Sequence, residues 1–245
     1  MRLFVAFCIL SISTPVFCDD SGHAVGHTRG HKAVHAPKRL KTKPNLVSED
    51  SWNSALESNV YQGTTYLSPS ISYSGANGWD IGVATYNIPV QGGGAQNFEF
   101  DTYLGISKTF ELNKQTLLVI GTQNGTTLLA NSDRRWHSLS YSHLRRDIFS
   151  NLNIYVGPYY ANANLTSSVN QVGFMTGFEL KILPNKIHLT GDYISGHQNV
   201  SGAVVDVQYF ITPKVQMYIG IVIPETNSGN EFAGVFGFNV STKDL

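Results

Sequence analysis

Cysteine is nearly absent from this 245-residue chain, in which Cys8 and Cys18 are the only two examples. Both precede Asp19, where we expect a leader to be cleaved, so the mature chain would carry no thiol. That excludes disulfides and thiolate metal sites. Long apolar runs are also missing after the first 18 residues, which excludes a helical membrane span on hydropathy grounds. If the mature chain enters a membrane, it does so as strands.

The amino-terminal residues predict export. Arg2 gives the amino terminus a positive charge, Leu3–Ile12 is apolar but too short to span a bilayer, and Pro15 ends the apolar pattern. Residues 1–18 are therefore interpreted as a signal peptide. Lipid attachment at Cys18 is the less favoured alternative, because bulky Phe17 stands where lipidation wants a small residue.

Aromatic residues and acids are scarce in the next segment, 19–50. It has no Phe, Tyr or Trp, and residues 21–48 hold six Lys and Arg with no acid. Such a composition cannot bury enough apolar surface to offset chain entropy. We predict a disordered basic tail over 19–50, followed by one folded domain over 51–245.

The folded part shows sustained period-two alternation. In 171–182, large apolar residues at even positions oppose polar or small residues at odd positions, and 98–107 repeats the pattern. Alternation continues in 202–211, with apolar residues at odd positions, and in 215–223, again with the apolar residues at odd positions. This pattern predicts an all-β, antiparallel sheet with one apolar and one polar face.

A soluble β-sandwich or a lipocalin-like barrel would show similar alternation. Two features favour a transmembrane barrel: the strands reach about ten residues, enough to cross a bilayer when tilted, and aromatics recur near strand ends. The polar faces also carry charges that suit a wet lumen better than a dry core. The candidate pore-lining residues are Glu99, Asp101, Glu179, Lys181, Asp192 and Asp206.

The connections give a strand count and an orientation. Tight turns are predicted at 75–78, 111–114, 183–186 and 212–214, with a slightly longer one after Asp147, and are assigned to the periplasmic side. Looser connections are predicted at 89–97, 123–134, 161–170, 195–201 and 224–230, and are assigned to the outside. Counting back from the carboxyl end, and adding a strand at 52–62, predicts an up-and-down barrel of about twelve strands, with ten as the alternative.

The order of Ser51–Gly63, Ser68–Tyr73, a Gly-rich turn and Trp79–Asn87 resembles the start of a family of poorly characterised, porin-like proteobacterial outer-membrane barrels. The likeness extends over about 51–240 and depends on aromatic and glycine placement. It implies a fold and a location in the cell outer membrane. We expect the tail to lie in the periplasm. No catalytic residues follow from the likeness.

Four histidines in the tail recur every four residues, at His23, His27, His31 and His35. Neutral imidazoles bind Zn, Cu or Ni, so weak metal binding is one hypothesis for this segment. The interspersed glycines disfavour the helix that would align the rings. A soluble basic spacer is the alternative interpretation. No other cofactor is expected.

Enzymatic signals are weak, and we expect no enzyme. Gly196–Ser201 superficially resembles the His and Ser neighbourhood of the outer-membrane phospholipase, but His197 and Ser201 are four residues apart in an expected loop, whereas that family spaces its pair by two. The glycines of 92–94 lack the Lys-Ser/Thr of a phosphate loop. No basic, aromatic-interleaved face indicates nucleic acid.

The sequence is compatible with three functions. The first is a narrow porin-like channel for small solutes, the second a non-conducting structural or adhesive barrel, and the third, disfavoured, a lipid-modifying enzyme. The expected partners are outer-membrane lipids, the barrel-insertion machinery and small solutes.

Overall fold

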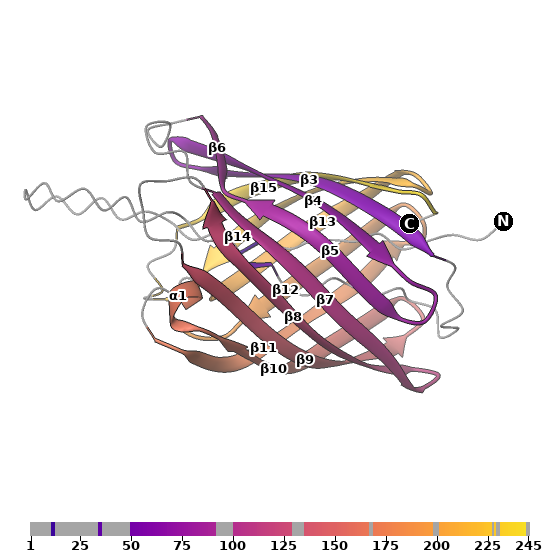
Figure 1. Cartoon of the computed structure of the whole chain (residues 1–245). Helices are drawn as coiled ribbons and strands as arrows, with labels where there is room; N and C mark the ends of the chain where they lie inside the picture. Colours follow the sequence, from indigo (N-terminus) through magenta and orange to yellow (C-terminus); the bar gives the residue numbers. More distant parts are fainter. Residues whose placement is uncertain are drawn as a thin grey trace, which may run out of the picture.

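The computed structural model describes residues 11–12, 34–35, 50–91, 100–128, 135–166, 169–197, 201–226, 228 and 231–243. Twelve antiparallel strands form a closed barrel (Figure 1), because β3 pairs with β4 on one side and with β15 on the other. These strands are β3 (Ser51–Tyr61), β4 (Thr64–Ser74), β5 (Trp79–Tyr86), β7 (Phe100–Asn113), β8 (Thr116–Leu128), β9 (Trp136–Phe149), β10 (Leu152–Ala161), β11 (Gln171–Leu183), β12 (Ile187–Ile194), β13 (Gly202–Thr212), β14 (Val215–Pro224) and β15 (Ala233–Ser241). The predicted all-β barrel of twelve strands is confirmed.

Few other elements accompany the barrel. A short strand, β6 (Ile88–Gln91), pairs with β4, and one four-residue helix, α1 (Ala163–Thr166), follows β10. Two-residue strands β1 (Ser11–Ile12) and β2 (Val34–His35) pair with each other. In the described part of the chain, no helix is long and apolar enough to cross a membrane.

The two ends of the barrel differ in their connections. One end holds the short turns after β4, β7, β9, β11 and β13, together with the start of β3 and the end of β15. The other end holds the longer connections and α1 (Figure 1), together with the two-residue turn between β3 and β4. This division agrees with the predicted tight and loose connections. Their assignment to the periplasm and the outside stays a prediction.

Two predicted loops are partly wrong. Residues 123–128 belong to β8, where they pair with both β7 and β9, although their polar composition predicted a loop. Threonine is β-branched and suits a strand, which explains why this polar stretch stays extended. Residues 89–91 likewise belong to β6 and not to an open loop.

Side chains alternate strictly across the barrel wall. On β11, Phe174 and Ile182 face outward while Met175, Gly177 and Glu179 are buried on the inner face, as the sequence predicted. On β14, Ile219 is outward and 65% exposed, whereas Tyr218 beside it is 3% exposed. Closure pairs both edges of the twelve barrel strands, and their outer face is mostly apolar, which is the arrangement a bilayer requires.

Candidate functional site: the barrel interior

The inner face concentrates charge. Among the described residues, its buried charged side chains, apart from histidine, are Glu57, Asp80, Asp101, Glu179, Asp192 and Asp206, with Arg145 as the one base. Each is at most 6% exposed. Lys181 lies on the same face of β11 as Glu179, closer to the short-turn end and half-buried. Carboxylates therefore dominate the charge of the interior.

The structure places most of the predicted pore-lining residues on this inner face. Asp101, Glu179, Lys181, Asp192 and Asp206 all point inward, each from the strand face expected for it. Glu99, the sixth, falls outside the described residues. A role for these residues in conduction stays a prediction.

Glu179 is the centre of a charged network that spans four strands. Its carboxylate accepts hydrogen bonds from Arg145 of β9 at 3.3 Å and from Asn153 of β10 at 2.9 Å. The ring of His188 on β12 lies 2.8 Å from its other oxygen. All four side chains are buried, so the network ties β9, β10, β11 and β12 together from inside. Sequence reasoning placed Glu179 on the inner face but missed Arg145, Asn153 and His188 as its partners.

Tyrosine is the other recurring inward residue. Eight of the twelve tyrosines lie on the inner face: Tyr61, Tyr66, Tyr86, Tyr103, Tyr141, Tyr155, Tyr159 and Tyr218. In the described strands, Phe210 is the single inward phenylalanine, whereas other phenylalanines face outward. The inner face thus selects the aromatic side chain that carries a hydroxyl, which a polar surface can hydrogen-bond.

A repeated arrangement holds many of these rings. Tyr218 on β14 stands opposite Gly237 on β15, which stands opposite Glu57 on β3, and the tyrosine hydroxyl donates to Glu57 at 3.0 Å. A Cβ on Gly237 would overlap the Tyr218 ring. The side chain therefore crosses one whole strand along the wall, over a glycine, to reach an acceptor two strands away.

The same arrangement occurs four more times. In each case an inward tyrosine lies over a glycine of the neighbouring strand, and its hydroxyl hydrogen-bonds to a residue on the strand beyond or, for Ser195, directly after it. The sets are Tyr103, Gly125 and His137 (2.8 Å); Tyr141, Gly121 and Ser107; Tyr155, Gly177 and Asp192; and Tyr159, Gly173 and Ser195 (2.5 Å). Because these five rings follow the wall, the tyrosine side chains run around the barrel and not across it.

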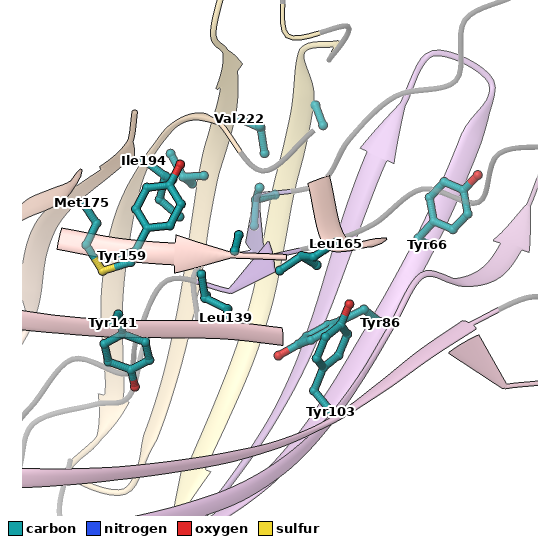
Figure 2. Close-up of a cluster of buried hydrophobic side chains, with 14 of the residues drawn as sticks. Tyr66, Tyr86, Tyr103, Leu139, Tyr141, Tyr159, Leu165, Met175, Ile194 and Val222 are labelled. Atoms are coloured by element: carbon teal, nitrogen blue, oxygen red, sulfur yellow. The ribbon is translucent and has the colours of Figure 1, made fainter. Parts of the chain in front are cut away.

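The part of the interior nearest the longer loops combines this arrangement with a carboxylate. The rings of Tyr86 and Tyr103 lie side by side (Figure 2), with centroids 5.3 Å apart, and Tyr103 stacks on His137 at 5.7 Å. Asp101 lies 3.7 Å from the His137 ring nitrogen and accepts a hydrogen bond from Thr127 at 2.7 Å. This cluster places a titratable ring and an acid inside one entrance of the barrel.

At the short-turn end, the carboxylate of Asp50, which precedes β3, is hydrogen-bonded to the backbone. The amide N–H of Ala76 donates to Asp50 at 2.9 Å, and this hydrogen bond lowers the pKa of the Asp50 carboxyl. Asp50 therefore adds a negative charge at this end of the barrel.

The loop that superficially resembles a phospholipase site has other contacts. The ring of His197 lies 3.2 Å from the carbonyl oxygen of Thr226, and the hydroxyl of Ser201 donates to the carbonyl of Ser195 at 3.2 Å. The Ser195 hydroxyl oxygen in turn accepts a hydrogen bond from the backbone N–H of Phe174 on β11, at 2.8 Å. These contacts tie the loop to β11 and to Thr226.

The metal hypothesis lies mostly outside the described residues. His23, His27 and His31 are not described, and only the backbone of His35 is, within β2. Within the ranges that the structure does describe, no group of three or more His, Cys, Asp or Glu side chains could hold a metal ion. Weak binding of Zn, Cu or Ni by the tail remains a prediction.

No protein-family model matches the sequence, and no curated protein is significantly similar to it. Solved structures are similar in fold. The KdgM porin is 12% identical with a TM-score of 0.55, covering 77% of this chain and 98% of KdgM. The NanC porin is also 12% identical, with a TM-score of 0.54 over 78% of this chain and 100% of NanC. The fold of this chain is therefore similar to that of outer-membrane porins.

Proposed function

We propose that this chain is an outer-membrane, porin-like channel for small solutes and that it favours cations over anions. The observation that carries the proposal is the imbalance of charge on the inner face, where six buried carboxylates accompany one buried guanidinium among the described residues. Unbalanced charge is very costly in a dry core but is tolerated in a water-filled lumen. The apolar outer face supplies the complementary surface for lipid.

The strand number supports a narrow channel. Barrels of eight strands are filled by their own side chains, whereas those of sixteen or eighteen strands enclose a wide aqueous pore. Twelve strands fall between these limits. Because the five tyrosines described above run along the wall, their rings do not span the barrel from one side to the other.

A non-conducting barrel is the second candidate, and one observation favours it. The inward polar side chains are nearly inaccessible, with Asn59, His137 and Gln216 each 0% exposed. Tight packing of this kind restricts the lumen. A lipid-modifying enzyme has no comparable support: Ser195 accepts from the backbone N–H of Phe174, and Ser201 donates to the carbonyl oxygen of Ser195.

Conductance of the purified protein in planar lipid bilayers tests the proposal. A channel should give discrete current steps, and in a salt gradient its reversal potential should have the sign of cation preference. Heat-denatured protein from the same preparation is the control. A correctly folded barrel, shown by altered gel mobility before boiling, that gives no steps would support the non-conducting alternative.

The solute class can be narrowed by charge. One KdgM structure was solved in complex with disordered oligogalacturonate, a polymer that carries a carboxylate on each sugar. In this chain, the inward acids Asp101, Asp192 and Asp206 would repel such a polyanion. We expect oligogalacturonate to leave the single-channel current unchanged, and small cations to pass. Block of the current by this polyanion would contradict cation preference.

A further inference from the structure

Polar side chains cluster on the outer face of two neighbouring strands of the barrel. On each of β8 and β9, three successive outward positions carry hydroxyl or amide groups where most other strands carry large apolar residues. We call this set the outer polar patch: Thr122, Asn124, Thr126, Ser138, Ser140 and Ser142. The registers of Ser140 opposite Thr122 and Ser138 opposite Asn124 make it continuous across the two strands.

The patch is only partly satisfied by its own hydrogen bonds. The Asn124 amide donates to Thr122 at 3.0 Å and accepts from Ser138 at 2.8 Å, and Thr122 and Ser140 hydroxyls lie 3.3 Å apart. Each amide nitrogen carries two N–H donors, so Asn124 keeps one that contacts no acceptor in the described residues. Ser140 is exposed on the outer surface.

The patch reaches the depth of the lipid chains. Trp136, 58% exposed, marks the loop end of the outer face of β9. Two residues of a strand advance about 7 Å, or about 5 Å in depth at the usual tilt, so Ser142 lies about 15 Å below Trp136. An apolar band is about 25 Å tall, which puts Ser142 near its middle. Water cannot satisfy polar groups there, so a protein surface is the better partner.

We propose that the outer polar patch is the contact surface of a homodimer, formed with a second copy of this chain in the membrane. All six side chains are small, uncharged and able to donate and accept hydrogen bonds, so the patch is complementary to itself. In a two-fold dimer with its axis along the membrane normal, equal depths face each other and Asn124 meets the partner's patch. Small side chains also let two walls approach closely.

The surroundings of the patch fit such an interface. Leu104 of β7 borders it on one side, opposite Asn124, and Tyr160 of β10 borders it on the other, opposite Ser140. Both are exposed on the outer face, at 46% and 42%. A dimer would therefore surround its polar contacts with apolar side chains. This proposal does not depend on whether the lumen conducts.

Cysteine cross-linking in outer membranes tests the dimer. Ser140→Cys should give a disulfide-linked species of twice the monomer mass on mild oxidation, at least about ten-fold more than the matched variant Ser58→Cys. Ser58 is an outward serine on β3, five strands away around the barrel, between Leu67 and Phe236. The unsubstituted protein, oxidised in the same way, shows how much cross-linking Cys8 and Cys18 give by themselves. Equal yields from the two variants, or adducts of other masses only, would overturn the proposal.

A second substitution tests whether the outer polar patch holds the dimer or whether two barrels are cross-linked after a chance collision. Adding Asn124→Leu to Ser140→Cys should lower the cross-linked fraction roughly ten-fold, because one embedded polar contact is lost from each copy. Gel mobility before and after boiling checks that the barrel still folds. A folded double variant that cross-links as well as Ser140→Cys alone would show that the patch does not hold the dimer.

Discussion

The hydroxyl of Tyr155 on β10 hydrogen-bonds to the carboxylate of Asp192 on β12, crossing the intervening strand β11 above Gly177. Gly177 lies in register with both residues, and a Cβ there would come within 2.5 Å of the tyrosine ring. The hydrogen bond therefore depends on a missing side chain. It also fixes the direction of the tyrosine, which follows the barrel wall.

Gly177→Ala should separate Tyr155 from Asp192 and destabilise the barrel by about 1–3 kcal/mol, the usual cost of overpacking. Gly234→Ala is the matched control, because a Cβ on Gly234 would meet only one atom, the Val60 carbonyl oxygen at 4.0 Å. Urea unfolding in detergent micelles, followed by tryptophan fluorescence, compares the two. Equal stability of both variants would mean that the wall relaxes around the new methyl group.

Ile219→Arg should lower the free energy of unfolding by about 2–4 kcal/mol if this outward side chain contacts lipid near the middle of the bilayer. Phe174→Arg should behave in the same way, since Phe174 is also exposed on the outer face, at 49%. Ile219→Leu is the control for shape without charge. Unfolding measured in lipid vesicles gives the free energies, and a cost for Ile219→Arg no larger than that of Ile219→Leu would contradict a lipid-facing outer surface.

Arg145→Met should destabilise the barrel by about 3–5 kcal/mol, because Glu179 would keep its charge in a buried site without the guanidinium. The double variant Arg145→Met, Glu179→Gln should recover much of that loss, since it removes both charges. Urea unfolding at pH 7.5 gives the two free energies. If the double variant is less stable than the single one, the hydrogen bonds of Glu179 to Asn153 and His188 contribute more than its charge costs.

The alternation of the sequence was enough to predict the architecture. In 171–182 the period of two separated Phe174 from Glu179, and turn residues at either side limited the strand, so both faces could be assigned from local information. Closure followed because an unpaired edge is not tolerated in lipid. The strand count then depended only on recognising each run.

The contacts of the interior could not be predicted in this way. Tyr155, Gly177 and Asp192 belong to three strands, and their meeting depends on two registers that no local pattern specifies. The contact between Arg145 and Glu179 could not be predicted for the same reason, because it also depends on the registers of neighbouring strands. The stretch 123–128 differs from its predicted loop for another reason: it is polar on both faces, because Asn124 and Thr126 belong to the outer polar patch while Thr127 faces inward and bonds to Asp101.

Replacing Asp101 and Asp206 with Asn should reduce cation preference, because both carboxylates point into the lumen from separate strands, β7 and β13. Each amide keeps an oxygen that can accept the present hydrogen bonds from Thr127 and Gln208, so the fold should be retained. The change should be modest, since the inward acids are spread over several strands and form no single ring.

The reversal potential in a salt gradient measures this effect. Asp50→Asn removes an acid outside the strands and serves as the control, for which we expect little change. Lys181 lies two residues from Glu179 on the same face, so this base offsets part of the remaining field. An unchanged reversal potential in the double variant would show that Asp101 and Asp206 do not act on permeating ions, and that Arg145 or charges at the entrances determine the selectivity.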